Sequence, residues 1–167
     1  MEIIYREAQP SDAKALLDYL QIIGGESDNL TFGSTGLPFS TEQEAQFLSS
    51  KLNDSHSLIL LAFDGDKLVG NGSIDGNEHP RLGHRCSLAI TVCKSHWGCG
   101  IGSGLVERLI DFAKVSKAEV VELQVRSDNE RAKALYRKFG FEKFGTYQKF
   151  FKIDGKYYDA DYMNLYL

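Results

Sequence analysis

The 167-residue sequence contains few cysteines and no long apolar stretch. Its three cysteines, at positions 86, 93 and 99, form no Cys-x-x-Cys pair, and the odd number argues against both a disulfide framework and a zinc site. The longest purely apolar run, residues 58–63, is far shorter than the roughly 20 residues that cross a bilayer. Charged residues near the start interrupt the apolar core that a signal peptide needs. We therefore expect no bound metal, no membrane partner and a cytoplasmic protein.

An excess of positive charge is also missing. Lysine and arginine together number 19 against 23 aspartates and glutamates, which gives a formal net charge of −4. Proteins that bind the phosphate backbone of DNA or RNA usually carry a basic surface, so we expect no nucleic-acid partner. The apolar fraction of 43% and the charged fraction of 25% are ordinary for a globular protein. The length suits one core, and we expect a single domain over residues 1–167.

Apolar periodicity and turn residues divide the chain into strands and helices. Ser11 is expected to cap the first helix and Gly24-Gly25 to end it. Ser40 and Gln43 have capping-box spacing at the start of the second helix. The expected helices are residues 11–25, 40–52, 101–115 and 129–139, and the expected strands are residues 2–8, 57–63, 67–75, 84–92, 119–126, 142–153 and 156–167.

The resulting element order is β-α-α-β-β-β-α-β-α-β-β. Its middle β-α-β segment, with a crossover of about 25 residues, predicts one parallel strand pair joined by a right-handed connection. Asp-Gly pairs at 64–65 and 154–155 are hairpin signals, which predict antiparallel pairing elsewhere. The predicted fold class is α/β (α+β): a mixed, mostly antiparallel sheet of six to seven strands, with one central parallel pair and helices on both faces.

Four glycines, at positions 98, 100, 102 and 104, stand where the third helix should begin. Glycine lets a backbone approach a ligand closely, and a helix N-terminus offers unpaired N–H groups and partial positive charge, so the cluster predicts a phosphate-binding loop. No glycine of the cluster is followed by lysine, which excludes a Walker loop. A G-x-G-x-x-G fingerprint fails from Gly98, where the sixth place is Ser103, and from Gly100, where it is Leu105.

Two motifs do match one family. "WGCGIG", residues 97–102, resembles the acetyl-CoA loop of the GCN5-related N-acetyltransferases (GNAT), Arg/Gln-x-x-Gly-x-Gly/Ala, except that Trp97 occupies the first position. About 30 residues later, "NERAKALYRKFGF" is similar to the family signature N-x-x-A-x-x-x-Y-x-x-x-G-F. The expected element order also agrees with this family over nearly the whole chain, which implies the acyl-CoA N-acyltransferase fold.

The resemblance implies an N-acetyltransferase that uses acetyl-CoA as co-substrate. In this family the loop amides wrap the CoA diphosphate, a strand pairs with the pantetheine arm, and a tyrosine hydroxyl protonates the departing sulfur. The last role falls to Tyr136, which core packing alone would also explain. The implied cofactor-binding residues are Ile90, Val92, Trp97, Gly98, Cys99, Gly100, Ile101, Gly102, Ser103, Asn129 and Tyr136.

The general base has no obvious candidate in the sequence. Relatives often carry a glutamate on the strand before the glycine loop, but here that position is about Ser87, a poor base. Glu26 is the first substitute, and His84 and Glu78 are weaker ones; a solvated surface role is the competing interpretation for each. Cys99, at a helix start, is either an activated thiol or an inert loop thiol.

The acceptor remains open at the level of sequence. The first hypothesis is a primary amine of a small molecule, and the alternatives are a protein N-terminus or an acyl-CoA-binding regulatory module without turnover. Residues 26–39 are expected to form part of the acceptor site. Family analogy also suggests a homodimer. Aromatic residues of the last two strands could line the acceptor pocket, belong to the core or form a dimer surface: Phe150, Phe151, Tyr157, Tyr158, Tyr162 and Tyr166.

Overall fold

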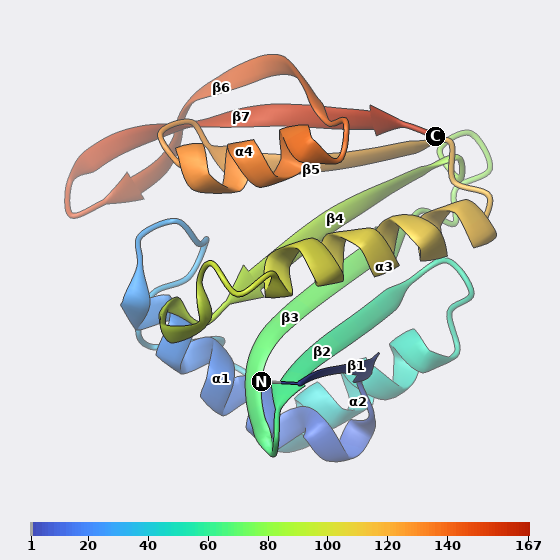
Figure 1. Cartoon of the computed structure of the whole chain (residues 1–167), viewed down its shortest axis with the longest axis vertical. Helices are drawn as coiled ribbons and strands as arrows, with labels where there is room; N and C mark the ends of the chain where they lie inside the picture. The colour runs from blue at the N-terminus through green and yellow to red at the C-terminus, as the bar shows by residue number, and fades with distance from the viewer. Residues whose placement is uncertain (1) are drawn as a thin grey trace.

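A computed structural model describes residues 2–167 as one seven-stranded sheet in the order β1-β2-β3-β4-β5-β7-β6 (Figure 1). Among the strands of these residues, β4 and β5 alone pair in parallel, and every other neighbouring pair is antiparallel. The predicted mixed sheet with one central parallel pair is therefore confirmed. The strands are β1 Ile3–Glu7, β2 Leu58–Asp64, β3 Lys67–Gly76, β4 Arg85–Val92, β5 Val120–Arg126, β6 Glu142–Ile153 and β7 Lys156–Tyr166.

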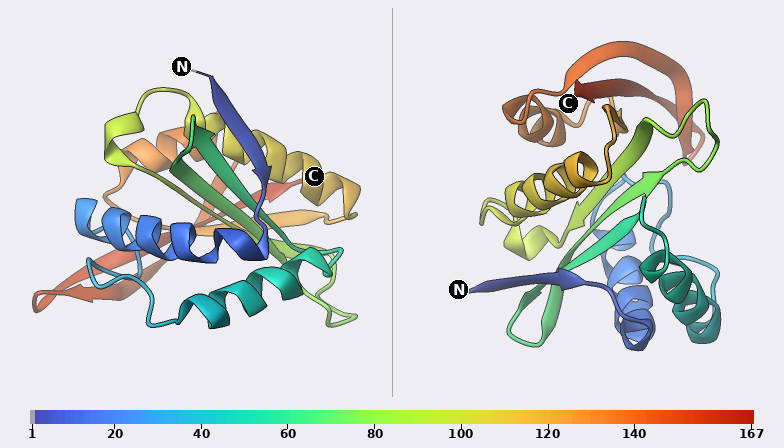
Figure 2. Two further views of the ribbon diagram at one scale, coloured as in Figure 1. Left: turned by 90° about the horizontal axis from the view of Figure 1, so that it is seen from below. Right: turned by 90° about the vertical axis from the view of Figure 1, so that its right-hand side faces the viewer.

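Helices cover both faces of the sheet, as predicted (Figure 2). The helices α1 Ala13–Glu26 and α2 Thr41–Leu52 lie on one face, and α3 Ile101–Val115 and α4 Glu130–Lys138 on the other. Two short 3-10 turns, η1 Pro10–Asp12 and η2 Lys94–His96, precede α1 and α3. Successive strand residues alternate between the two cores: Leu60 packs with the α3 core, whereas Leu61 packs with the α1 and α2 core. This alternation decides which side chains of β4 and β5 face which pair of helices.

Both predicted ends of the first helix are wrong. Ser11 does not cap it, because residues 10–12 form the turn η1, and the Asp12 carboxylate there accepts the Gln9 N–H at 2.7 Å. The glycine pair does not stop the helix, which continues through both glycines to Glu26. A Cβ built on Gly24 would lie 2.1 Å from the Gly33 carbonyl oxygen. Gly24 is therefore needed for the close approach of the following loop.

The predicted start of the second helix is confirmed in detail. The Ser40 hydroxyl accepts the Gln43 N–H at 3.1 Å, and the Gln43 side-chain oxygen accepts the Ser40 N–H at 2.9 Å. This reciprocal pair satisfies two backbone donors that the helix itself leaves free. The predicted hairpin turns at Asp64 and Asp154 also join β2 to β3 and β6 to β7.

The parallel strands β4 and β5 pair over a short distance only. Their register joins Arg85 to Val120, Cys86 to Val121 and Ser87 to Glu122, and includes no later residue of either strand. Beyond this point the strands separate toward their carboxyl ends, which are the ends where sheets of this class bind ligands. The central sheet therefore opens into a gap between β4 and β5.

The β6–β7 hairpin closes one edge of the sheet and extends past it (Figure 1). Its register is irregular between Lys143 and Gly145 and between Tyr147 and Phe151, which bends the hairpin. Its far end lies at the same end of the molecule as the loop between α1 and α2. No helix within residues 2–167 is long and apolar enough to cross a membrane.

Candidate active site

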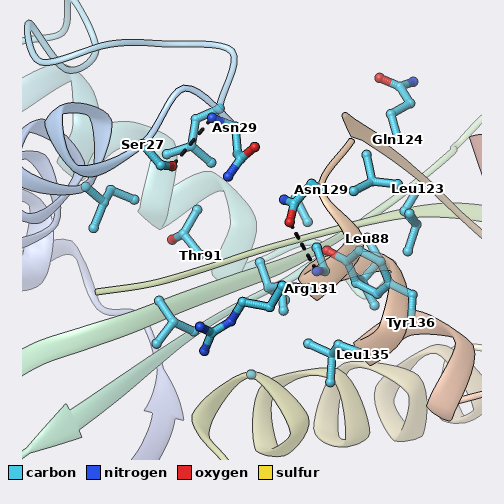
Figure 3. A pocket seen from close by; sticks show the side chains of 18 of the residues that line it. Ser27, Asn29, Leu88, Thr91, Leu123, Gln124, Asn129, Arg131, Leu135 and Tyr136 are labelled. Atoms are coloured by element: carbon cyan, nitrogen blue, oxygen red, sulfur yellow. Dashed lines mark hydrogen bonds between the residues drawn. The ribbon is translucent and has the colours of Figure 1, made fainter. Parts of the chain in front are cut away.

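A cavity of about 650 Å³ occupies the gap between β4 and β5. Its lining comes from the end of α1 and the loop after it, from β4 and β5, from the start of α3, from α4, and from the β6–β7 hairpin. Figure 3 shows Leu88 and Leu123 from the two separating strands, together with Tyr136 and Leu135 of α4. The cavity thus gathers both predicted motifs and the predicted acceptor loop at one place.

The four glycines have two different structural causes. Gly98 and Gly100 have φ values of 81° and 82°, a left-handed conformation that disfavours other residues, and open space surrounds both Cβ positions. At Gly102 a Cβ would lie 3.0 Å from the Leu135 side chain, and at Gly104 it would lie 2.3 Å from the Tyr5 hydroxyl. The first two glycines therefore shape the loop, and the other two permit close packing of α3.

The start of α3 presents free backbone donors to the cavity. The N–H groups of Ile101, Gly102 and Ser103 make no backbone hydrogen bond within residues 2–167, and all three residues line the cavity. Such unpaired amides at a helix N-terminus suit the oxygens of a phosphate group. The residues present therefore fit the diphosphate of a CoA cofactor.

Most residues predicted to bind the cofactor line this cavity. They are Ile90, Val92, Trp97, Gly98, Gly100, Ile101, Gly102, Ser103, Asn129 and Tyr136. Cys99 is the exception: it is exposed and absent from the described lining, and its thiol lies 3.9 Å from the Trp97 carbonyl oxygen.

Tyr136 lies in the α4 wall of the cavity (Figure 3). Its ring is 6% exposed and packs edge-on against Phe141, with 5.7 Å between ring centroids. Its hydroxyl makes no hydrogen bond to another described side chain or backbone group. Burial raises the pKa of this hydroxyl well above its ordinary value, so it stays protonated at neutral pH. Tyr136 is thus a proton donor with no competing partner.

Asn129 caps the helix α4. It precedes α4, and its side-chain oxygen accepts the Ala132 N–H at 3.2 Å (Figure 3). Since Asn129 also lines the cavity, the cap fixes the first turn of α4 beside the cofactor loop. This turn carries Arg131, and Tyr136 follows one turn later.

Glu26 lines the cavity, but its carboxylate is engaged. One oxygen accepts the Lys94 backbone N–H at 2.7 Å, which ties the end of α1 to the turn before the glycine loop. Among the described residues, the weaker base candidates Glu78 and His84 do not line the cavity, and neither does Asp28. His96 does line it, and its Nε2 lies 3.3 Å from an Asp64 carboxylate oxygen.

Two other carboxylates reach the cavity, and sequence reasoning missed both. Asp75 on β3, Ser87 on β4 and Glu122 on β5 are register neighbours in a row across the sheet, on the face toward α1 and α2. The Ser87 hydroxyl lies 3.5 Å from a Glu122 carboxylate oxygen. Glu122 therefore lies next to Ser87, the position at which the family resemblance leads us to expect a glutamate. Only the parallel register, which the sequence does not specify, brings the two together.

Each of these carboxylates is paired with a cation on the side away from the cavity. Arg85 hydrogen-bonds Glu122, and the Lys51 ammonium lies 2.7 Å from Asp75. Asp75 and Glu122 belong to the described cavity lining, whereas Arg85 and Lys51 do not. The carboxylate of each pair, and not its cation, therefore belongs to the described lining.

Aromatic residues and the α1–α2 loop enclose the rest of this wall. Of the predicted aromatic set, Phe150, Phe151 and Tyr162 line the cavity, and Phe150 packs edge-on against the other two, with centroids 4.8 and 6.5 Å apart. The loop contributes residues 29–32. Arg126 at the end of β5 donates to the Asp28 carbonyl oxygen at 3.1 Å and so pins this loop across the cavity.

Comparison with known proteins agrees with this geometry. The "Acetyltransferase (GNAT) family" model matches residues 27–141. The chain is 34% identical to the L-amino acid N-acetyltransferase AaaT of Escherichia coli over 63% of its length, and 34% identical to the N-alpha-acetyltransferase RimI of Mycobacterium tuberculosis over 63%. These matches span just under two thirds, 65%, of each relative.

A solved structure gives a fuller match. The GNAT acetyltransferase of Streptococcus pneumoniae superposes with a TM-score of 0.96 at 30% identity, over 99% of this chain and 100% of that one. The two proteins thus share one fold over their whole length. On these grounds, the chain belongs to the GNAT family of acetyltransferases.

Proposed function

We propose that this protein is an N-acetyltransferase that transfers an acetyl group from acetyl-CoA to a primary amine of a small molecule. The observation that carries the proposal is a single cavity with free helix amides on one side, a protonated tyrosine in its wall and two carboxylates on the other side. The free amides suit binding of the CoA diphosphate, and the transfer itself uses a proton acceptor for the amine and a proton donor for the leaving thiolate.

The cofactor half is formed by β4, the glycine loop and the start of α3. The amides of Ile101, Gly102 and Ser103 would hold the diphosphate, and the backbone of Ile90 and Val92 would lie along the pantetheine arm. When bound, acetyl-CoA supplies an acetyl thioester whose C–S bond breaks as the amine nitrogen bonds to the acetyl carbon.

Tyr136 is the general acid of this proposal. The leaving thiolate, whose pKa is about 8.5, departs more readily when a proton reaches its sulfur. A tyrosine hydroxyl is protonated at neutral pH, and burial, which raises the pKa of Tyr136, keeps it so in this wall. Because the hydroxyl has no partner among the described residues, no existing hydrogen bond must break first.

Glu122 is the general base that we favour. An alkylamine of pKa about 10.4 is about one part in a thousand neutral at pH 7.4, so a base must remove a proton before attack. Glu122 lines the cavity beside Ser87, and a water molecule between its carboxylate and the amine would relay the proton. Glu26, whose carboxylate already accepts the Lys94 N–H, is the second candidate.

The enclosed wall supports a small acceptor. The loop held by Arg126 and the β6–β7 hairpin border the same part of the cavity, so an extended peptide would have to pass between them. The name of the Escherichia coli relative describes an N-acetyltransferase of L-amino acids, and that of the Mycobacterium tuberculosis relative an N-alpha-acetyltransferase. Acetylation of a protein N-terminus is therefore the alternative.

A thiol-release assay tests the proposal. Purified protein, acetyl-CoA and a panel of small amines and N-terminal peptides are mixed, and free CoA is followed with a chromogenic disulfide. Release that depends on a small amine supports the proposal, and release that depends on peptides alone supports the alternative. If neither gives release although acetyl-CoA raises the melting temperature, the chain is a binding module. The homodimer and the cytoplasmic location stay predictions.

A further inference from the structure

Trp97 differs from the family pattern and makes two unusual contacts. Its indole N–H donates to the Val92 carbonyl oxygen at 2.8 Å, which fixes the ring against the end of β4. The guanidinium carbon of Arg131 lies 4.3 Å from the centroid of the same ring, a cation–π geometry. Arg131 reaches this position from the first turn of α4 and extends into the cavity (Figure 3).

Arg131 has no anionic partner within the described chain. It makes no ion pair and no side-chain hydrogen bond with residues 2–167, although the protein carries a net negative charge. Every acidic residue of α4 and of the turn before it is used elsewhere: Asp128 pairs with Arg126 at 2.7 Å, and Glu130 with Lys133 at 2.8 Å. The guanidinium donors of Arg131 are therefore free to bind a ligand.

Two lysines add positive charge near the stacked side chains of Arg131 and Trp97. The Lys94 ammonium lies 6.0 Å from the Trp97 ring centroid, and the Lys138 ammonium lies 3.5 Å from the Ser103 hydroxyl. Neither lysine forms an ion pair with a described residue. The helix N-terminus at Gly100 adds its own partial positive charge. Positive side chains without acidic partners repel one another and the positive end of the helix. A bound anion would relieve this repulsion.

We propose that Arg131, held against the Trp97 indole, is a ligand of the CoA diphosphate. This inference rests on the proposed use of acetyl-CoA. The planar guanidinium donates two parallel hydrogen bonds to phosphate oxygens, and a ring beneath it restrains the side chain before the ligand arrives. Arg131 thus supplies the cationic side chain that the loop lacks at position 97. Tryptophan suits position 97 because its hydrogen bond to Val92 fixes the ring, and the Arg131 guanidinium stacks on that ring.

The protein carries its own probe of this site, since Trp97 is the single tryptophan of the sequence. Its fluorescence is followed while CoA or dephospho-CoA is added to wild-type protein, to Arg131→Gln and to Arg137→Gln. Arg137 is a matched control, because it lies on the same helix, is exposed and is not part of the described cavity lining. The melting temperature of each protein without ligand is measured in parallel.

We expect Arg131→Gln to weaken binding of both ligands about tenfold or more, because both contain the diphosphate and a charged hydrogen bond is lost. Its melting temperature without ligand should be unchanged or higher, since an unpaired cation leaves the helix N-terminus. Arg137→Gln should bind both ligands as the wild type does.

Three results would overturn the inference. The first is unchanged CoA binding by Arg131→Gln. The second is weaker binding of CoA but not of dephospho-CoA, which would assign Arg131 to the 3′-phosphate. The third is weaker binding together with a lower melting temperature of the ligand-free variant, which would make the role of Arg131 structural. If wild-type protein binds neither ligand, by fluorescence or by a change in melting temperature, the proposed function itself fails.

Discussion

The two halves of the cavity differ in charge and in construction. The proposed cofactor half combines free amides of α3 with the unpaired cation Arg131, and Lys94 and Lys138 lie nearby outside the described lining. The proposed acceptor half presents Asp75 and Glu122, each paired with a cation outside the described lining, beside a group of aromatic rings. An anionic cofactor and a cationic amine would each meet the complementary wall. The difference therefore indicates how one cavity could orient two substrates of opposite charge toward the same point.

The largest expected effect concerns Tyr136, which lies between the halves. Tyr136→Phe removes only the hydroxyl, so kcat should fall about 1000-fold while CoA affinity stays unchanged. Steady-state kinetics and a CoA titration measure the two quantities. Tyr147→Phe, an exposed residue of β6, is the control and should change neither. An unchanged kcat in Tyr136→Phe would refute the assigned role.

The second-largest effect concerns the hydrogen bonds and ion pairs of Asp161, which connect α4 to the β6–β7 hairpin. Asp161 on β7 is 1% exposed; its carboxylate accepts from Ser127 at 2.8 Å and Thr146 at 2.9 Å, and lies 3.1 Å from the ammonium groups of Lys133 and Lys143. Burial opposes its ionisation, but these donors outweigh burial and hold the pKa of Asp161 well below its usual range. Lys133 belongs to α4, so this network ties the helix of Tyr136 to the acceptor hairpin.

Asp161→Asn should lower the free energy of unfolding at pH 7 by about 3 kcal/mol, because two cations lose their buried partner. The lowered pKa stabilises the fold above the unfolded value of about 3.9, and this contribution disappears as the pH falls toward the folded-state pKa. The difference in the free energy of unfolding between wild type and variant, measured in urea, should therefore become smaller below about pH 4. Asp154→Asn, in an exposed turn, should cost little. A gap that is independent of pH would contradict this account.

The third effect separates the two candidate bases. Glu122→Gln should lower kcat/KM about 100-fold at pH 7, with activity rising about tenfold per pH unit as the free amine deprotonates itself. Glu26→Gln should have a smaller effect, because its carboxylate holds the Lys94 amide. The pH–rate profiles of both variants give the answer. The larger loss in Glu26→Gln would transfer the base role to Glu26.

The smallest effect concerns loop shape in the cofactor half. Gly98→Ala meets no neighbouring atom, but its φ of 81° is unfavourable for alanine by about 1 kcal/mol. The melting temperature should drop slightly and CoA should bind a few-fold more weakly. Gly145→Ala has equally open surroundings without the positive φ, so it should leave CoA binding unchanged. Equal effects of the two substitutions would show that the positive φ of Gly98 does not cause the loss of binding.

Most residues proposed to bind the cofactor could be named from sequence, and the two carboxylates of the opposite wall could not. Two contiguous motifs contain Trp97, the glycines, Asn129 and Tyr136, because one loop and one helix supply most of this part of the cavity lining. Glu122 went unnoticed because its closeness to Ser87 depends on a three-residue parallel register. The contact between Arg131 and Trp97 also escaped sequence reasoning, since it joins two motifs through side chains.

The glycines show the same limit. A glycine pair suggested the end of α1, but Gly24 lies inside the helix because the Gly33 carbonyl packs against it. Local sequence reports the conformational freedom of glycine, whereas only the tertiary structure reveals whether that freedom is used for a turn, a ligand or close packing. The Ser40 cap, a purely local device, was predicted correctly.

Both substrates should occupy the one cavity together, and the acetyl group should pass directly from acetyl-CoA to the amine. Initial rates measured over a grid of acetyl-CoA and amine concentrations test this direct transfer, with the amine found by thiol release. Direct transfer predicts double-reciprocal lines that intersect, because a ternary complex forms. Parallel lines, together with an acetylated enzyme trapped in the absence of amine, would reveal a covalent intermediate and contradict the account.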